Sequence, residues 1–221
     1  MTRPGAARRC GWTALAAAAA FALLTAAVLH AHPGPLPGDA ALHQWSLAHR
    51  PAVAVALSRA ITATGTGVIP LAAVVAAGLS VGRTPRQRVT TAAGLALCLG
   101  AGQALRYAVM TLVARPRPAL GDWATHASGW SFPSGHATTG AMTAGLLIAA
   151  LLLRGPRLPR LAAVLIGLWG AAVGLTRVHL GVHWFSDVLG GWLFATAWLA
   201  LAACAYLRLT RDGAGPNPNT S

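Results

Sequence analysis

The chain has 221 residues, of which 55% are hydrophobic and only 10% are charged. A soluble domain carries about 25% charged residues, so this composition argues against one and favours a multi-pass membrane protein. The net charge of +13 comes from arginines that lie between apolar segments, so we expect membrane lipids and no nucleic acid as partners. Three cysteines lie far apart and predict neither a disulfide nor a metal site.

Six apolar stretches are candidates for membrane-spanning helices, which need about 20 mostly apolar residues. They cover residues 11–30, 66–81, 89–114, 137–153, 161–175 and 184–207. We therefore expect an all-α membrane protein with six transmembrane helices in a domain of residues 11–210. A basic tail of residues 1–10 should precede the domain, and a disordered tail of residues 211–221 should follow it. No clear cleavage site follows the first stretch, which predicts an uncleaved helix. Between the first two stretches, residues 40–61 predict an amphipathic helix at the membrane interface.

Arginines mark one side of this layout. They precede the first stretch, occupy the second and fourth loops, and follow the last stretch: Arg3, Arg8, Arg9, Arg83, Arg86, Arg88, Arg154, Arg157, Arg160, Arg208 and Arg211. The positive-inside rule makes that side cytoplasmic, so both termini should lie inside a cytoplasmic membrane. The first, third and fifth loops should then face outward, and they hold the unusual polar residues.

The fifth loop contains the sequence "TRVHLGVHWFSD", from residue 176 to 187. His183 and Asp187 are four residues apart and share one face if they lie on a helix. A carboxylate bonded to one imidazole nitrogen fixes the tautomer and leaves the other nitrogen free to act as a base or nucleophile. Arg177 presents a guanidinium suited to phosphate oxygens. This loop therefore predicts a His–Asp pair beside an anion-binding arginine.

The third loop contains "ARPRP" and then "FPSGH", which runs into the fourth apolar stretch. Ser134 and Gly135 fall where the first N–H groups of a helix lack intrahelical partners, a position that favours an anion. His136 follows them as a second candidate for proton transfer. Arg115 and Arg117 add positive charge nearby. The two loops together supply what phosphoryl transfer needs, namely positioning and stabilisation of charged oxygens.

These motifs resemble those of the type 2 phosphatidic acid phosphatase superfamily, the membrane relatives of acid phosphatases and vanadium haloperoxidases. That family's pattern is Lys-x6-Arg-Pro, then Pro-Ser-Gly-His, then Ser-Arg-x5-His-x3-Asp. Here the second motif is intact at residues 133–136, and the third has Thr176 in place of serine. The first motif fits Arg117-Pro118, but the position of its lysine holds Met110. The resemblance covers about residues 106–192.

The resemblance implies a role for each matched residue. His183 would be the nucleophile that forms a phosphohistidine, Asp187 would orient it, and His136 would protonate the leaving alkoxide. The phosphate oxygens would be held by Arg117, Arg177, Ser134 and the N–H of Gly135. No metal and no cofactor is implied. Since methionine cannot donate to phosphate, we expect a neighbouring arginine to compensate, either Arg106, one helical turn before Met110, or Arg115. The alternative is a phosphate site that is weakened or differently selective.

The function expected is a phosphatase for lipid phosphomonoesters or polyprenyl diphosphates, with its site at the outer face of the membrane. The sequence does not distinguish among these lipids, and it does not address the oligomeric state. Two alternatives remain open: a zinc site formed by His179, His183 and Asp187, which fall at i, i+4 and i+8, and a non-enzymatic transporter or lipid-phosphate-binding protein. For His179 itself we expect a packing role.

Overall fold

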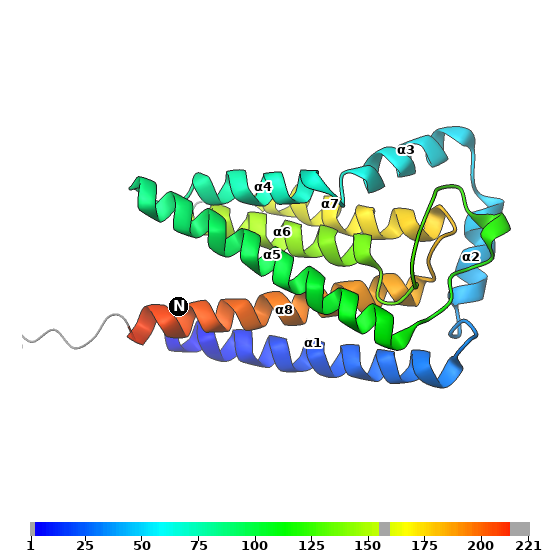
Figure 1. The fold of residues 1–221 in the computed structure, drawn as a ribbon, viewed down its shortest axis with the longest axis horizontal. Helices are drawn as coiled ribbons and strands as arrows, with labels where there is room; N and C mark the ends of the chain where they lie inside the picture. The colour runs from blue at the N-terminus through cyan, green and yellow to red at the C-terminus, as the bar shows by residue number, and fades with distance from the viewer. Residues whose placement is uncertain (1–2, 155–159, 213–221) are drawn as a thin grey trace, which may run out of the picture.

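The computed structural model describes residues 3–154 and 160–212, and the regular structure in these two ranges is entirely helical (Figure 1). A short 3₁₀ turn, η1 (Leu120–Asp122), lies in the loop between α5 and α6. The helices, in chain order, are α1 (Arg3–Ala31), α2 (Asp39–Ala48), α3 (Ala52–Ala63), α4 (Val68–Leu79), α5 (Pro85–Val113), α6 (Gly135–Arg154), α7 (Arg160–His179) and α8 (Phe185–Asp212).

Over the described residues, five helices are long and apolar enough to cross a membrane, namely α1, α5, α6, α7 and α8. The pair α3 and α4, bent by 51° at a short break, passes the same test together and completes a layout of up to six spans. Helix α4 has only 12 residues, or about 18 Å, which is short for a hydrocarbon core of about 30 Å. Helix α4 lies within the stretch predicted over residues 66–81, but it reaches the length of a span only together with α3, across the bend.

The prediction of one amphipathic helix over residues 40–61 is wrong. Helix α2 ends at Ala48, and α3 begins after Pro51, which has an extended backbone at the N-cap position. A proline disfavours helical geometry in the residue before it, here Arg50, so the chain turns between the two helices. As a result α2 lies across the end of the bundle, and α3 continues into the second span (Figure 1).

The boundaries of α1 and α8 differ from those predicted for the two terminal tails, residues 1–10 and 211–221. Helix α1 begins at Arg3, so the basic segment of residues 1–10 is helical from that residue onward. Helix α8 extends to Asp212. Residues 213–221, for which disorder was expected, lie outside the described residues, as does Arg157 of the fourth loop.

The long helices lie side by side and expose much of their apolar surface. Helix α1 packs against α8, and α6 packs against both α7 and α8. Exposed leucines such as Leu23 (73%), Leu97 (72%) and Leu112 (82%) form a surface suited to lipid. The interior holds a cluster of buried side chains: Val74, Leu99, Met142, Leu146 and Ala195.

Small residues bring α6 and α7 into close contact. A Cβ atom added at Gly170 would lie 3.0 Å from the carbonyl oxygen of Gly140 and 2.9 Å from the Cβ of Ala144. Helices in membranes commonly approach one another at such small residues. Because α6 begins and α7 ends at the same end of the bundle, this contact places the start of α6 beside the end of α7 (Figure 1).

Different helix ends and loops lie at the two ends of the bundle. Helix α1 begins and α8 ends at one end, where α6 also ends, α7 begins, and the loop between α4 and α5 lies (Figure 1). At the opposite end, α5 and α7 finish and α6 and α8 begin, and the long loop of residues 114–134 folds over them. The third and fifth loops of the sequence are therefore brought together at this second end.

Candidate active site

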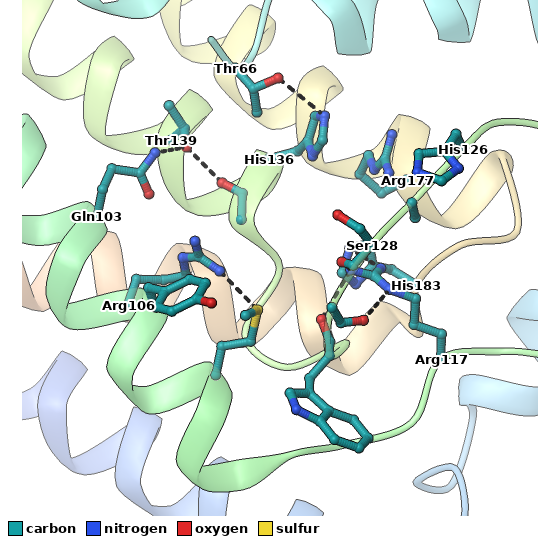
Figure 2. Close-up of a pocket in the computed structure, with 16 residues that line it drawn as sticks. Thr66, Gln103, Arg106, Arg117, His126, Ser128, His136, Thr139, Arg177 and His183 are labelled. Atoms are coloured by element: carbon teal, nitrogen blue, oxygen red, sulfur yellow. Dashed lines mark hydrogen bonds between the residues drawn. The ribbon is translucent and has the colours of Figure 1, made fainter.

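A cavity of about 500 Å³ opens at the second end of the bundle (Figure 2). Its walls come from residues before α4, from α5, from the 126–130 segment, from the start of α6, from the end of α7 and from the loop before α8. The lining residues are Thr66, Gln103, Arg106, Tyr107, Met110, Arg117, His126, Ala127, Ser128, Gly129, Trp130, Gly135, His136, Thr139, Arg177 and His183. The lining joins residues that are more than 100 positions apart in the sequence.

His183 is buried, with 1% of its surface exposed, and both ring nitrogens have partners. Nδ1 lies 3.2 Å from Oδ2 of Asp187 and 3.3 Å from the hydroxyl of Ser131. Nη1 of Arg117 donates to Nε2 at 2.8 Å. Since arginine can only donate, Nε2 must be the acceptor, and the neutral ring then carries its proton on Nδ1 toward Asp187. This is the tautomer that leaves Nε2 unprotonated on the cavity side, where its electron pair accepts from Arg117.

Burial lowers the pKa of His183 to about 4, with the bond to Asp187 opposing this effect and the charges of Arg117 and Arg177 adding to it. The imidazole is therefore neutral at physiological pH. A neutral ring keeps the electron pair on Nε2, which a nucleophile or base requires.

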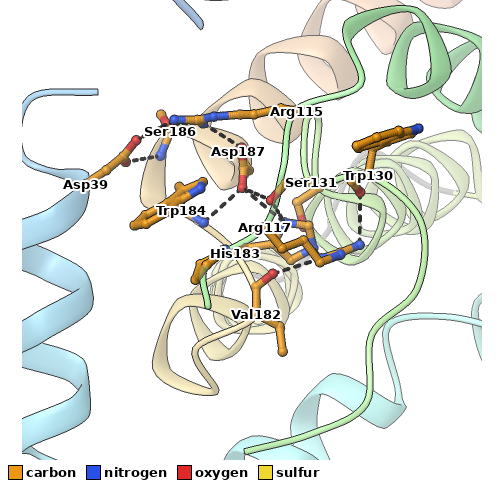
Figure 3. A network of polar contacts seen from close by, with 12 residues as sticks. Asp39, Arg115, Arg117, Trp130, Ser131, Val182, His183, Trp184, Ser186 and Asp187 are labelled. Atoms are coloured by element: carbon orange, nitrogen blue, oxygen red, sulfur yellow. Dashed lines mark hydrogen bonds and ion pairs between the residues drawn. The ribbon is translucent and has the colours of Figure 1, made fainter. Parts of the chain in front are cut away.

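Asp187 is fully buried at the start of α8 and is held by several donors (Figure 3). Its Oδ2 accepts from the backbone N–H of Trp184 at 2.9 Å and from the hydroxyl of Ser131. Its Oδ1 accepts from Nη1 of Arg115 at 2.7 Å. These bonds fix the carboxylate on the side of His183 that faces away from the cavity.

Arg115 is completely buried and does not line the cavity. Besides Asp187 it contacts Asp39, whose Oδ2 lies 2.9 Å from Nη2, and the hydroxyl of Ser186 at 2.7 Å. Its donors face these buried partners behind His183, so the expectation that Arg115 replaces the missing lysine at the phosphate site is wrong. The physical reason is the two buried carboxylates, which require a buried cation between them.

Arg117 lies between His183 and the 126–130 segment. It donates to the backbone carbonyls of Ser128, Gly129, Trp130 and Val182 at 2.8–3.0 Å, in addition to its contact with His183. Burial lowers the pKa of Arg117 from its usual value, although a guanidinium remains charged. This single side chain therefore brings positive charge to Nε2 of His183 and holds the segment that covers the cavity.

His136 and Arg177 line the same cavity from α6 and α7. Nε2 of His136 lies 3.4 Å from the hydroxyl of Thr66. Arg177 is 2% exposed, and its Nη1 donates to the hydroxyl of Thr62 at 3.3 Å. The second histidine and the second arginine expected from the sequence thus face His183 across the cavity (Figure 2).

Gly135 and Ser134 occupy different positions relative to the cavity. Gly135 lines it at the first residue of α6, where helix N–H groups are free to meet an anion. Ser134 is fully buried and is not among the lining residues, and its backbone N–H donates to the carbonyl of Asp187 at 3.0 Å. The hydroxyl of Ser134 has no partner in the described structure. The structure therefore brings Gly135 to the cavity and leaves Ser134 behind its wall.

Arg106 and Met110 line the cavity one helical turn apart on α5. Nη1 of Arg106 lies 3.1 Å from the sulfur of Met110, a weak acceptor. A Cβ atom added at Gly135 would lie 3.4 Å from Cζ of Arg106, so the guanidinium packs against the start of α6. Arg106 thus occupies the side of the cavity where the family pattern expects a cation.

The alternative zinc site is not supported by the geometry. Helix α7 ends at His179 and α8 begins at Phe185, so His179, His183 and Asp187 do not share one helical face. Across residues 3–154 and 160–212, no three His, Cys, Asp or Glu side chains lie close enough together to hold a metal ion. The backbone carbonyl of His179 accepts from Ser46, and the charge near its ring comes from Arg50, not from the cavity.

Several residues of this end were not singled out from the sequence. Asp39, Ser131 and Ser186 contact the Asp187–Arg115 pair, and Thr66, Gln103 and Tyr107 line the cavity. Ser131 lies two residues before the Pro-Ser-Gly-His motif, so its nearness to that motif could have marked it as a candidate site residue. For Asp39 the only signal was its rarity, since the chain has four acidic residues.

Three comparisons with known proteins agree on the family. A model of the PAP2 superfamily matches residues 91–211, which is more than half of the chain. The chain is 41% identical over 94 residues to lipid A 1-phosphatase of Rhizobium etli, covering 40% of this chain and 37% of that protein. It is 34% identical over 100 residues to phosphatidylglycerophosphatase B of Bacillus subtilis, covering 43% of this chain and 48% of that protein. It is 33% identical over 90 residues to undecaprenyl-diphosphatase of Sulfolobus acidocaldarius, covering 39% of this chain and 36% of that protein.

These matches span less than half the length of the curated relatives. The fold is similar over a much greater length to the crystal structure of a transmembrane PAP2 type phosphatidylglycerolphosphate phosphatase from Bacillus subtilis. That similarity has a TM-score of 0.72 at 23% identity and covers 92% of this chain and 98% of the other. The all-helical membrane fold predicted from the sequence is thereby confirmed. With the family model matched over residues 91–211 and both motifs placed around one cavity, the chain belongs to the PAP2 superfamily.

Proposed function

We propose that this protein is a phosphatase that hydrolyses lipid phosphomonoesters or polyprenyl diphosphates through a phosphohistidine on His183. The observation that carries the proposal is the environment of His183. Its Nε2 is an acceptor on the cavity side with the Arg117 guanidinium 2.8 Å away, and its Nδ1 is backed by the buried Asp187. The relatives named above are phosphatases of lipid A, phosphatidylglycerophosphate and undecaprenyl diphosphate.

The first step would form a bond between Nε2 of His183 and phosphorus and break the bond from phosphorus to the leaving oxygen. His136, across the cavity, would donate its proton to that oxygen, which leaves as an alcohol or as a lipid phosphate. Asp187 would stabilise the imidazolium character that develops on His183. The negative phosphoryl oxygens would be met by Arg117, Arg177, Arg106 and the first N–H groups of α6.

The second step would use water. His136, now neutral, would take a proton from the water as its oxygen bonds to phosphorus, and the bond from phosphorus to Nε2 would break. Inorganic phosphate would leave, and neutral His183 and protonated His136 would be restored. Arg117 would exchange its present contact with Nε2 for phosphate oxygens as the substrate enters. The scheme requires no cofactor and no metal.

We also propose that the cavity faces the outside of the cytoplasmic membrane and that both termini lie in the cytoplasm. The arginines of the other end support this orientation: Arg8, Arg9, Arg83, Arg86, Arg88, Arg154, Arg160 and Arg208. A cysteine placed at Ser128 in a chain without its three native cysteines tests it. Labelling from outside is expected, and labelling only from the cytoplasm would reverse the orientation.

The decisive experiment for the activity is release of inorganic phosphate from a panel of lipid phosphates in detergent. The panel contains phosphatidate, phosphatidylglycerophosphate and a polyprenyl diphosphate, each with vanadate and with a strong chelator. Release that vanadate blocks and the chelator leaves intact is expected. His183→Ala should lower turnover by a factor of about 10⁴ or more, as removal of a nucleophile does, while the protein still inserts into the membrane. Near wild-type turnover in His183→Ala would refute the assignment of the nucleophile.

A further inference from the structure

Asp39 is a buried carboxylate outside the region that the PAP2 model matches. It begins α2, and 3% of its surface is exposed. Four donors surround it: the backbone N–H groups of Leu36 and Ser186 at 3.0 and 2.9 Å, the hydroxyl of Ser186 at 2.5 Å, and Nη2 of Arg115 at 2.9 Å. Asp39 and Arg115 therefore form a buried ion pair.

Asp39 connects to the cavity through a chain of buried charges (Figure 3). Arg115 is bonded to Asp39 on one side and to Asp187 on the other, and Asp187 is bonded to His183. The bond from Asp39 to the N–H of Ser186 also caps an early N–H of α8, two residues from Trp184, whose own N–H is capped by Asp187. Through Asp39, helix α2 therefore contacts both the charged group Arg115 and the backbone at the start of α8, next to the loop that carries His183.

The order of charges along this chain has an electrostatic consequence. A single arginine paired with a single aspartate would be neutral, and Asp187 would then offer little net negative charge to His183. With a second carboxylate on Arg115, the group of three carries a net charge of −1. The interaction is strong because these side chains are almost completely buried, where charges are poorly screened.

We propose that Asp39 is a positioning residue for His183: it binds the far side of Arg115 and so keeps the negative charge of Asp187 available to the imidazole. The role rests on the proposed function, in which that imidazole attacks phosphorus. Asp39 touches no substrate. It acts by favouring the proton on Nδ1 and the positive charge that develops on the ring during attack.

The other charged groups that face His183 act in the opposite direction. Arg117 comes from the loop after α5 and Arg177 from α7, and the positive charge of each lowers the pKa of His183, while the ring of His136, from α6, supplies no negative charge. Across residues 3–154 and 160–212, only Asp187, on α8, provides a direct negative contact. The contribution of Asp39 is therefore not duplicated by another carboxylate among the described residues around His183.

The test compares Asp39→Asn with Ser46→Ala. The first substitution keeps the shape of the side chain and removes its charge. The second removes a different buried bond of α2, from Ser46 to the carbonyls of Val178 and His179 at 3.2 and 3.1 Å, and leaves the charges intact. Purified full-length protein in detergent is used, with ¹⁵N-labelled histidine so that the tautomer and pKa of His183 are read directly by NMR.

In Asp39→Asn we expect a smaller population of the Nδ1–H tautomer of His183 and a pKa of that ring lower by about half a unit or more. We also expect kcat for phosphate release to fall by about tenfold, with KM changed by less than about twofold, since substrate contacts stay in place. Ser46→Ala should match the wild type in tautomer and pKa. An unchanged tautomer and pKa in Asp39→Asn, or the same change in both variants, would overturn the inference.

A double variant, Asp39→Asn with Arg115→Gln, provides a second test, which remains usable if the single variant Asp39→Asn fails to fold. It removes one positive and one negative charge, so Asp187 keeps its full charge toward His183. The Nδ1–H tautomer should return to at least its wild-type population, and its loss in the double variant would overturn the inference. The NMR result is independent of turnover. Suppose that the tautomer of His183 differs between the wild type and Asp39→Asn as expected, but the wild type hydrolyses no lipid phosphate. That result would refute the proposed function and would leave the coupling of Asp39 to His183 intact.

Discussion

Replacement of Arg106 by alanine tests whether this residue supplies the cation that the family pattern assigns to the position of Met110. In the structure Arg106 lines the cavity and packs against Gly135 at the start of α6. Its Nη1 has only the sulfur of Met110 as a hydrogen-bond partner, at 3.1 Å, and Nε has none in the described residues. A half-buried guanidinium with so few partners is free to bond a phosphate oxygen.

The magnitude follows from the bond that would be lost. A hydrogen bond to a charged group contributes about 1.5–3 kcal/mol, so Arg106→Ala should lower kcat/KM by a factor of about 10 to 150. Arg106→Lys keeps the charge and should lose less than Arg106→Ala. Met110→Lys places a cation at the family position and should preserve or raise activity.

The assay is steady-state phosphate release from the best lipid substrate, with Arg88→Ala as the matched control. Arg88 lies on the same helix, is exposed, and sits near its opposite end. Arg88→Ala should behave as wild type. If Arg106→Ala retains wild-type kcat/KM, Arg106 does not compensate for the missing lysine, and the remaining cations of the cavity, Arg117 and Arg177, suffice.

Two further predictions concern the charges around His183. Arg115→Met leaves Asp39 and Asp187 buried without their cation and should destabilise the protein by about 3–5 kcal/mol. The loss is read as a lower midpoint of thermal unfolding in detergent. An unchanged midpoint would contradict the structural role of the ion pairs. Because burial lowers the pKa of His183 to about 4, the ring loses its nucleophilic electron pair only when the pH falls through that value. The acid limb of kcat/KM due to His183 should therefore lie near pH 4, and an acid limb near the ordinary imidazole value would contradict burial as the controlling effect.

Helix positions could be predicted where the apolar stretch was long and uninterrupted. The stretches of residues 89–114 and 137–153 correspond to α5 and α6 within a few residues at each end. The second span could not be predicted in the same way, because Pro51 and the glycines near residue 65 divide residues 39–79 into three short helices. Whether short helices combine into one span depends on what they pack against, and α3 and α4 pack against α7 and α5 respectively.

The cavity was predictable in its motif residues and not in its remaining walls. His136, Arg117, Arg177 and His183 carry polar groups at fixed spacings in a chain with few charges, so their chemistry was visible. Tyr107, Gln103 and Thr66 are single polar residues in apolar surroundings, and nothing in their spacing linked them to the motifs. They line the cavity because α5 and the start of α4 lie beside the start of α6.

The sequence by itself determined the class of fold and the motifs, because apolar length and local spacing are properties of the chain alone. Tertiary structure decided the roles of individual charges. Arg115 and Arg117 are two residues apart and equivalent by local pattern, yet one is buried between Asp39 and Asp187 while the other reaches Nε2 of His183. Ser134 and Gly135 are adjacent, and only Gly135 lines the cavity. A charge acquires its role from the partners that surround it after folding, and Asp39 is 148 residues away from Asp187 in the sequence.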